Sequence, residues 1–253
     1  MILKRVYDLA LPRLVGKKIN KFRVGLNLMA VELDDGSIGV TYVLKKEIDH
    51  FCLALPYAGR LSGMPAWEVA GWALHGDNVI AVAAGLAVLN AVAEFDNPEP
   101  EENYPADAAG AVEILPDDIV GVVGRIGPVI ANLQDKVQRL VVFERGDLAD
   151  GPVYPETYQP ELLPECRVVF ISSTSLINGT LENVLKYCTN ARDVIMVGAS
   201  TPLYPDAFAG TGVTVLSGTI WPSSNRDAIL TGISQCAGMR QIIDYGRKLS
   251  VRI

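Results

Sequence analysis

The chain has 253 residues, of which 49% are hydrophobic and 20% are charged, and its net charge at pH 7 is −7. This balance is typical of a folded globular protein and excludes a disordered chain. The scattered lysines and arginines form no basic run, so we expect no nucleic-acid partner. The longest apolar run, residues 79–92, is too short for a bilayer, so we expect no membrane span.

The N-terminal residues are expected to form an amphipathic helix of the mature protein, because they lack the sustained apolar core and the cleavage site of a secretion signal. The four cysteines, Cys52, Cys166, Cys188 and Cys236, lie far apart and form no C-x-x-C pair. Without a secretion signal or a disulfide framework, a reducing cytoplasm is the expected location.

The next segments predict a small α+β unit. Residues 22–33 and 37–44 are rich in β-forming residues and are separated by Asp35-Gly36, a strong hairpin signal. Residues 66–74 and 78–94 then show alanine-rich apolar patterns, each after a residue that suits a helix start. The first part of the chain should therefore be a hairpin covered by helices.

Composition also predicts where this unit ends. Residues 96–116 are rich in proline and acidic residues and contain few large apolar side chains, as expected of a linker. We therefore expect an α+β domain over residues 1–95 and an α/β domain over residues 117–253.

The second part of the chain alternates short apolar runs with helix-length segments, a pattern that predicts a Rossmann-like, doubly wound parallel sheet. A closing helix is expected from about Asn225 to Lys248. The five predicted strands are Ile119–Val123, Arg139–Phe143, Arg167–Ile171, Val194–Val197 and Val213–Leu216.

Ligands of such sheets bind beyond the carboxyl ends of the strands, so the loop after the first strand is of particular interest. It contains Gly124, Arg125 and Gly127, and Glu144 ends the second strand twenty residues after Gly124. That spacing suits an acid that binds a ribose hydroxyl, but the glycines depart from the G-x-G-x-x-G fingerprint. The glycines could serve tight backbone packing or the close approach of a ligand, and the sequence leaves both alternatives open.

Polar segments follow the third, fourth and fifth strands: SSTSLINGT (residues 172–180), GASTPLYP (198–205) and SGTIWP (217–222). Together with the glycine loop they predict a polar pocket, with Trp221 as a stacking wall. The alternative for the first of these segments is helix capping by Asn178 or Thr180.

Metal-binding and catalytic signatures are weak. His50 and Cys52 form an H-x-C pair and His75 lies at a helix end, but no third ligand follows at metal-site spacing. We therefore expect no preformed metal site. No G-x-S-x-G elbow or Ser-His-Asp set is found, so the catalytic residues and any cofactor stay unassigned.

The segments AAGLAVLNA, VGVVGRIGP, VVFERG, SSTSLINGTL, VGASTPLYPDAF and GVTVLSGT resemble a family of heavy-metal chelation proteins, over nearly the whole chain. The resemblance implies an enolase-N-terminal-like domain followed by a Rossmann-like domain, with a site between them for condensation or hydrolysis of pterin-, flavin- or siderophore-like molecules. The family commonly has Gly-Pro-Ser-Thr after the fourth strand, where this chain has Gly198-Ala199-Ser200-Thr201.

The resulting hypothesis is a protein that binds a small molecule, such as a metal chelate, with turnover and homo-oligomerisation left open. Any metal would belong to the ligand, because a protein with two histidines and widely spaced cysteines is a poor chelator. Two alternatives are an enzyme that uses adenosyl-methionine or NAD, and a non-catalytic carrier or sensor. The predicted ligand-binding residues are Gly124, Arg125, Gly127, Glu144, Thr174, Ser175, Asn178, Ser200 and Thr201, with Asn90 from the facing domain.

Overall fold

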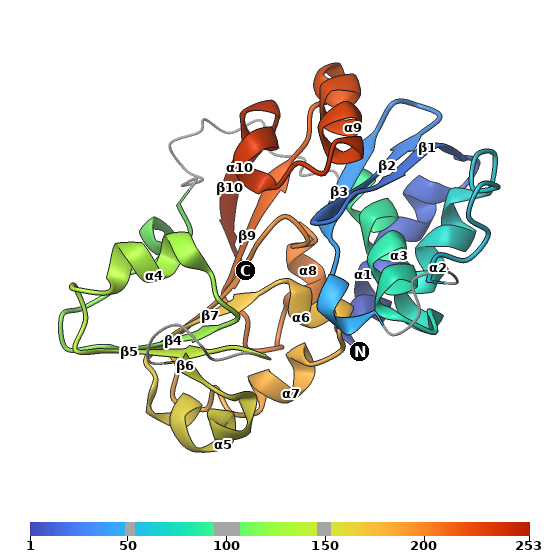
Figure 1. The fold of residues 1–253 in the computed structure, drawn as a ribbon. Coiled ribbons are helices and arrows are strands. Elements are labelled where there is room, and N and C mark those ends of the chain that lie inside the picture. Colours follow the sequence, from blue (N-terminus) through green and yellow to red (C-terminus); the bar gives the residue numbers. More distant parts are fainter. Residues whose placement is uncertain (49–53, 94–106, 146–152) are drawn as a thin grey trace.

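The structure is a computed structural model that describes residues 1–48, 54–93, 107–145 and 153–253 (Figure 1). His50, Cys52, the end of the second predicted helix and most of the predicted linker lie outside the described residues.

The N-terminal part contains helix α1 (Ile2–Leu14), the antiparallel strands β1 (Ile19–Val24), β2 (Leu28–Leu33) and β3 (Ile38–Tyr42), and then helices α2 (Ala66–His75) and α3 (Val79–Ala91). The prediction of one strand over residues 22–33 is wrong. The chain turns at residues 25–27, where the N–H of Gly25 donates to Leu28 O at 2.8 Å, and so a third strand forms.

Small residues allow α3 to approach both this sheet and helix α2 closely. A Cβ at Gly39 of β3 would lie 2.0 Å from Ala87 O of α3, and a Cβ at Gly85 would lie 2.2 Å from Ala73 N of α2. The opposite face of the small sheet, with Leu28 and Val40, packs against helix α9 (Arg226–Ser234). The small sheet therefore lies between two helical layers (Figure 1).

The second part of the chain forms a seven-stranded sheet in the order β10-β9-β8-β7-β4-β5-β6. All neighbours are parallel except β10, which runs antiparallel to β9. The predicted Rossmann-like α/β fold is thus confirmed, with strand order reversing between β4 and β7. The strands are β4 (Ile119–Val123), β5 (Arg139–Phe143), β6 (Val153–Tyr154), β7 (Val168–Ser172), β8 (Asp193–Val197), β9 (Val215–Ile220) and β10 (Arg247–Arg252).

Helices cover both faces of the large sheet. Val129 and Leu133 of α4 pack on one face, together with Ala108 and Ala109. The other face shares a hydrophobic core with the N-terminal part, so the two parts pack as neighbours; their predicted boundaries stay a prediction. The remaining bounds are α4 (Gly127–Leu133), α5 (Gln159–Leu162), α6 (Thr174–Ile177), α7 (Leu181–Leu185), α8 (Pro205–Phe208) and α10 (Met239–Ile242).

The prediction of a single closing helix over residues 225–248 is wrong. Helix α9 ends at Ser234, Cys236 has a positive φ of 63°, and the short α10 is followed by β10. Leu249 and Val251 of β10 are buried, and this strand pairs with β9 along its whole length. The pairing satisfies backbone groups that β9 would otherwise expose at a sheet edge.

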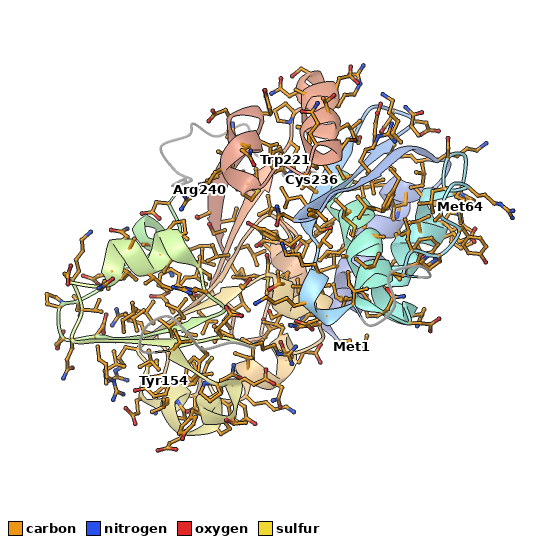
Figure 2. The ribbon with its side chains drawn as sticks, in the orientation of Figure 1. Met1, Met64, Tyr154, Trp221, Cys236 and Arg240 are labelled. Atoms are coloured by element: carbon orange, nitrogen blue, oxygen red, sulfur yellow. The ribbon has the colours of Figure 1, made fainter. Side chains whose placement is uncertain are left out.

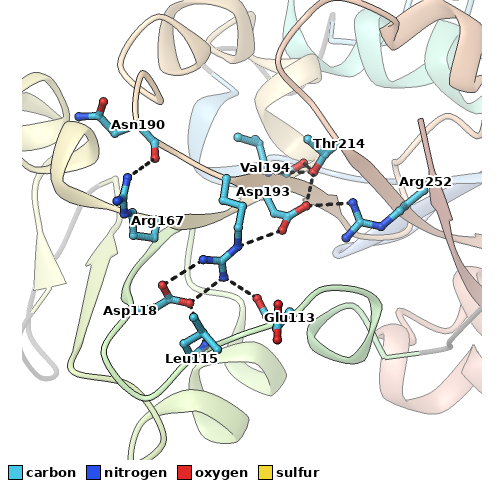
Figure 3. A network of polar contacts seen from close by, with 10 residues as sticks. Glu113, Leu115, Asp118, Arg167, Asn190, Asp193, Val194, Thr214 and Arg252 are labelled. Carbon is cyan, nitrogen blue, oxygen red and sulfur yellow. Dashed lines mark hydrogen bonds and ion pairs between the residues drawn. The ribbon is translucent and has the colours of Figure 1, made fainter.

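A polar network lies at the amino ends of β4 and β8 (Figure 3). Arg192 donates to Asp118 Oδ2 at 2.9 Å, while Arg252 donates to Asp193 Oδ1 at 3.2 Å. Burial opposes ionisation of Asp118, but the hydrogen bonds from Arg192 and from the N–H of Leu115 outweigh it, and the pKa of Asp118 lies below its usual range.

No helix in the described ranges is both long and apolar enough to cross a lipid bilayer.

Candidate functional site

A cleft of about 770 Å³ opens beyond the carboxyl ends of the parallel strands. Its floor consists of Val197 at the end of β8, of Gly198 and Ala199 just after it, and of Ser217 to Thr219 in β9. The glycine loop after β4 and the start of α4 form one wall, and α10 forms the other. The cleft is therefore at the reversal of strand order, where open α/β sheets commonly bind ligands.

Three basic side chains line this cleft: Arg125 from the glycine loop, Arg240 from α10 and Lys248 from β10. Figure 2 shows Arg240 on α10. Arg240 and Arg125 thus line the same cleft although they are far apart in the sequence. Two carboxylates, Asp107 and Glu144, also line it. Asp107 already accepts hydrogen bonds from Asn132 Nδ2 and from the N–H of Ala109.

The two glycines of the loop have different surroundings. Gly124 has a φ of +88°, and a Cβ there would lie 2.8 Å from the Cβ of Ser172. This glycine is therefore required by the tight turn and by the close approach of Ser172 at the end of β7. Gly127 has no positive φ, and a Cβ there would meet no atom within 4 Å. Gly127 also lines the cleft, so the lack of a side chain leaves open space there.

Glu144 lines the cleft beside this loop, but its oxygens already have partners. Its Oε2 accepts from the N–H of Arg125 at 2.7 Å, and its Oε1 accepts from the N–H of Arg145 at 3.0 Å. The carboxylate thus links the glycine loop to the end of β5. Each oxygen keeps one further lone pair, so a ligand hydroxyl remains a feasible additional donor.

The end of β7 and the segment that follows it face two cavities. Ser172 and Thr174 line the main cleft, and their hydroxyl oxygens lie 2.8 Å apart. Thr174, Ser175 and Asn178 line a smaller adjoining cavity of about 100 Å³, which also contacts Gly124 and Glu144. The buried Ser175 Oγ has no hydrogen-bond partner among the described residues.

Asn178 ends α6 and does not cap the next helix; Thr180 holds the N-cap position of α7 without a side-chain cap bond. In its best-satisfied orientation the Asn178 amide donates to Ser175 O and to Thr180 Oγ1, and it accepts from Arg145 Nη1 at 3.1 Å. Arg145 also donates to Glu47 of the N-terminal part at 3.1 Å. Asn178 is therefore part of a contact between the two halves of the chain.

The remaining predicted residues lie outside the main cleft. Ser200 is fully buried, and its Oγ accepts from the N–H of Tyr42 at 2.8 Å. Asn90 and Thr201 line a separate cavity of about 230 Å³. Trp221, predicted as a stacking wall, is buried and lines that second cavity, not the main cleft. The ten predicted residues thus fall around three cavities and one buried contact, and their ligand roles stay a prediction.

Sequence reasoning did not select Tyr42, Arg240 or Lys248 for the site. Tyr42 is the contribution of the N-terminal part to the cleft, and burial raises the pKa of its hydroxyl. Arg240 and Lys248 lie inside the predicted closing helix. Nothing in their local sequence distinguishes them from ordinary solvent-exposed charged residues of a helix. The sequence predicts a loop at residues 217–219, whereas these residues belong to β9.

Within the described residues, no three histidine, cysteine or acidic side chains gather as a metal-binding group. Two cysteines are also unsuited to thiolate chemistry, because burial raises the pKa of Cys166 and of Cys188 to about 12.

Comparison with known proteins identifies the family. A family model described as "Putative heavy-metal chelation" (DUF364) matches residues 107–252, more than half of the chain. The chain belongs to this family. A second model with the same description (DUF4213) matches residues 7–93, so the resemblance inferred from the loop motifs is confirmed.

Relatives of the family support the fold. An uncharacterized protein of Methanocaldococcus jannaschii is 35% identical over 150 residues, and the match spans 56% of this chain and 55% of the relative. Two crystal structures of DUF364 proteins with unknown function are similar over essentially complete chains. The one from Pyrococcus horikoshii has a TM-score of 0.83 at 22% identity, with both chains fully covered. The one from Desulfitobacterium hafniense has a TM-score of 0.77 at 21% identity, with 99% of each chain covered.

Proposed function

We propose that the main cleft binds a small anionic, metal-chelating molecule of the pterin, flavin or siderophore kind. The observation that carries this proposal is the pairing of three basic side chains, Arg125, Arg240 and Lys248, with an uncharged floor in a cleft of about 770 Å³. That volume is in the range of small-molecule sites.

The charge balance favours an anionic ligand. The chain as a whole is acidic, yet the cleft has three cations against two carboxylates, both of which already accept backbone hydrogen bonds. A carboxylate, catecholate or phosphate group would be attracted to this rim. The floor of small residues and backbone, including Gly198, Ala199 and Gly218, would accommodate a flat ring.

Metal chemistry would then belong to the ligand. A chelating molecule supplies its own donor atoms, so its metal complex needs a cleft of suitable shape and charge and no set of protein ligands. This division agrees with the family description and with the scattered positions of the described histidine, cysteine and acidic side chains.

Thermal-shift and calorimetric titration against pterins, flavins and siderophores, each with and without ferric iron, tests the proposal. We expect at least one class to stabilise the protein at concentrations well above its dissociation constant. The double variant Arg240→Ala, Lys248→Ala should weaken binding at least tenfold at low ionic strength. Lys186→Ala, which removes an exposed cation that does not line the cleft, is the matched control. Equal affinity in the double variant and the control would contradict the proposal.

The second candidate is an enzyme that uses a nucleotide cofactor. It is favoured by Glu144, which directly follows β5 and lines the cleft. It predicts that adenosyl-methionine or NAD binds and that Glu144→Ala weakens this binding. A third candidate is a carrier or sensor, which would bind its ligand in the same cleft and leave it chemically unchanged. Incubation of the protein with its bound ligand separates an enzyme from a carrier, because only an enzyme releases a chemically changed product.

A further inference from the structure

The second cavity, of about 230 Å³, lies where the two parts of the chain meet. Its walls come from the start of β3, the end of α3, the segment after β8 and the end of β9. None of the described residues that line it carries a charge. Thr219 lines both this cavity and the main cleft, so the two spaces are adjacent, and the rest of their described lining residues differ.

Three buried polar atoms belong to residues that line this cavity and have no hydrogen-bond partner among the described residues: Asn90 Oδ1, Thr201 Oγ1 and Trp221 Nε1. Thr201 and Trp221 are 3% and 7% exposed. The described residues contain only three other such side-chain atoms. An unsatisfied buried polar group costs about 1–3 kcal/mol, and half of these atoms belong to residues around one cavity, which favours a guest that satisfies them there.

The three atoms define the chemistry of that guest. Trp221 Nε1 only donates, so it needs an acceptor. The Asn90 amide donates to Val40 O at 3.3 Å, which leaves Oδ1 to accept from a donor. The Thr201 hydroxyl can do either. Since the described lining has no charge, a neutral guest with both an N–H and a C=O is the best match.

We propose that this cavity is a second binding site, for a small uncharged ring that presents an amide-type N–H and C=O edge. The cavity has the volume of roughly eight water molecules, enough for a single six-membered heterocycle. Ile38, Leu203 and Ile220 supply apolar contacts for the faces of such a ring. This inference goes beyond the proposed function, which concerns the main cleft.

The test uses uracil as the probe and 1,3-dimethyluracil, which lacks both N–H groups, as its matched control. Protein with ¹⁵N-labelled tryptophan gives one indole signal for each tryptophan, and Trp221→Phe identifies the signal of Trp221. We expect uracil to shift this signal saturably while Trp67 and Trp72 stay unchanged. The dimethyl compound should produce no such shift, because it cannot donate to Asn90.

Thr201→Val tests the site with little risk of unfolding, because the new methyl group replaces a buried hydroxyl that has no hydrogen-bond partner among the described residues. The variant should be at least as stable as the parent and should bind uracil about three- to tenfold more weakly. The double variant Arg240→Ala, Lys248→Ala should leave uracil binding unchanged, which separates this site from the main cleft.

Each of three results in solution would overturn the proposal: no shift of the Trp221 signal at millimolar uracil, equal shifts with both compounds, or full affinity in Thr201→Val. A crystal soaked with uracil that contains only water at Asn90 and Trp221 would likewise assign the cavity to bound water.

Discussion

The Glu144 carboxylate accepts a hydrogen bond from the backbone N–H of Arg125 at 2.7 Å, which joins the segments that follow the adjacent strands β4 and β5. The same carboxylate accepts from the N–H of Arg145. The acid that sequence spacing assigned to a ribose hydroxyl therefore also fixes the glycine loop. A ligand that approaches this wall meets a loop whose shape depends on Glu144.

Replacement of Glu144 by glutamine should destabilise the protein. The amide keeps one acceptor oxygen but places its NH₂ group beside a backbone N–H, so one of the two hydrogen bonds is lost. We expect a decrease of about 1–3 kcal/mol in the free energy of unfolding, measured by urea denaturation. Glu161→Gln, an exposed change of the same chemistry on α5, is the control. A neutral effect of Glu144→Gln would show that the loop holds its shape without the carboxylate.

Replacing each glycine of the loop by alanine distinguishes a glycine that the backbone conformation requires from one that leaves space for a ligand. Gly124→Ala should cost about 1–3 kcal/mol, because φ is +88° and the new Cβ would approach Ser172. Gly127→Ala should leave stability unchanged or raise it by up to about 1 kcal/mol. If a ligand approaches the loop backbone at Gly127, this stable variant should still lose affinity. Stability and ligand titration on the same two proteins check both expectations.

Asn178→Ser should lose more stability than a helix-capping role implies, because serine caps a helix about as well as asparagine. Serine retains a short polar side chain but cannot reach Arg145 Nη1, which lies 3.1 Å from the asparagine oxygen. We expect Asn178→Ser and Asn178→Ala to lose about 0.5–2 kcal/mol each. Full stability of the serine variant would indicate that the bond to Arg145 contributes nothing.

The acid stability of the protein should depend on Asp118. The pKa of Asp118 in the folded protein is lower than its usual value, since Arg192 and the N–H of Leu115 favour the carboxylate. Its contribution to stability is therefore complete above the ordinary aspartate pKa of about 3.9 and is lost as the pH falls through the lower folded value.

Asp118→Asn should reduce the free energy of unfolding at pH 7 by about 1–3 kcal/mol and flatten the loss of stability below about pH 4. Denaturation curves between pH 2 and pH 7 measure both effects. Asp117→Asn, at the exposed neighbouring position, is the control. A parallel pH dependence in the Asp118 variant and the parent would contradict the assignment.

Local sequence patterns were sufficient for much of the fold. The apolar runs at residues 119–123 and 139–143 coincide with β4 and β5, because strands buried on both faces need continuous apolar side chains. The loop motifs were sufficient for the family, and the glycines marked the turn at the reversal point. Each of these signals lies within a few consecutive residues, so it can be recognised without knowledge of which distant residues the segment contacts.

The tertiary structure decided what depends on distant partners. Strand β10 forms because β9 offers an unpaired edge, whereas its own residues fit the end of a helix equally well. Arg240 and Lys248 belong to the cleft wall because that strand and α10 return to the carboxyl ends of the sheet. Asn90, Thr201 and Trp221 converge on one cavity because two parts of the chain pack together. Such groupings arise from long-range packing, which no local periodicity records.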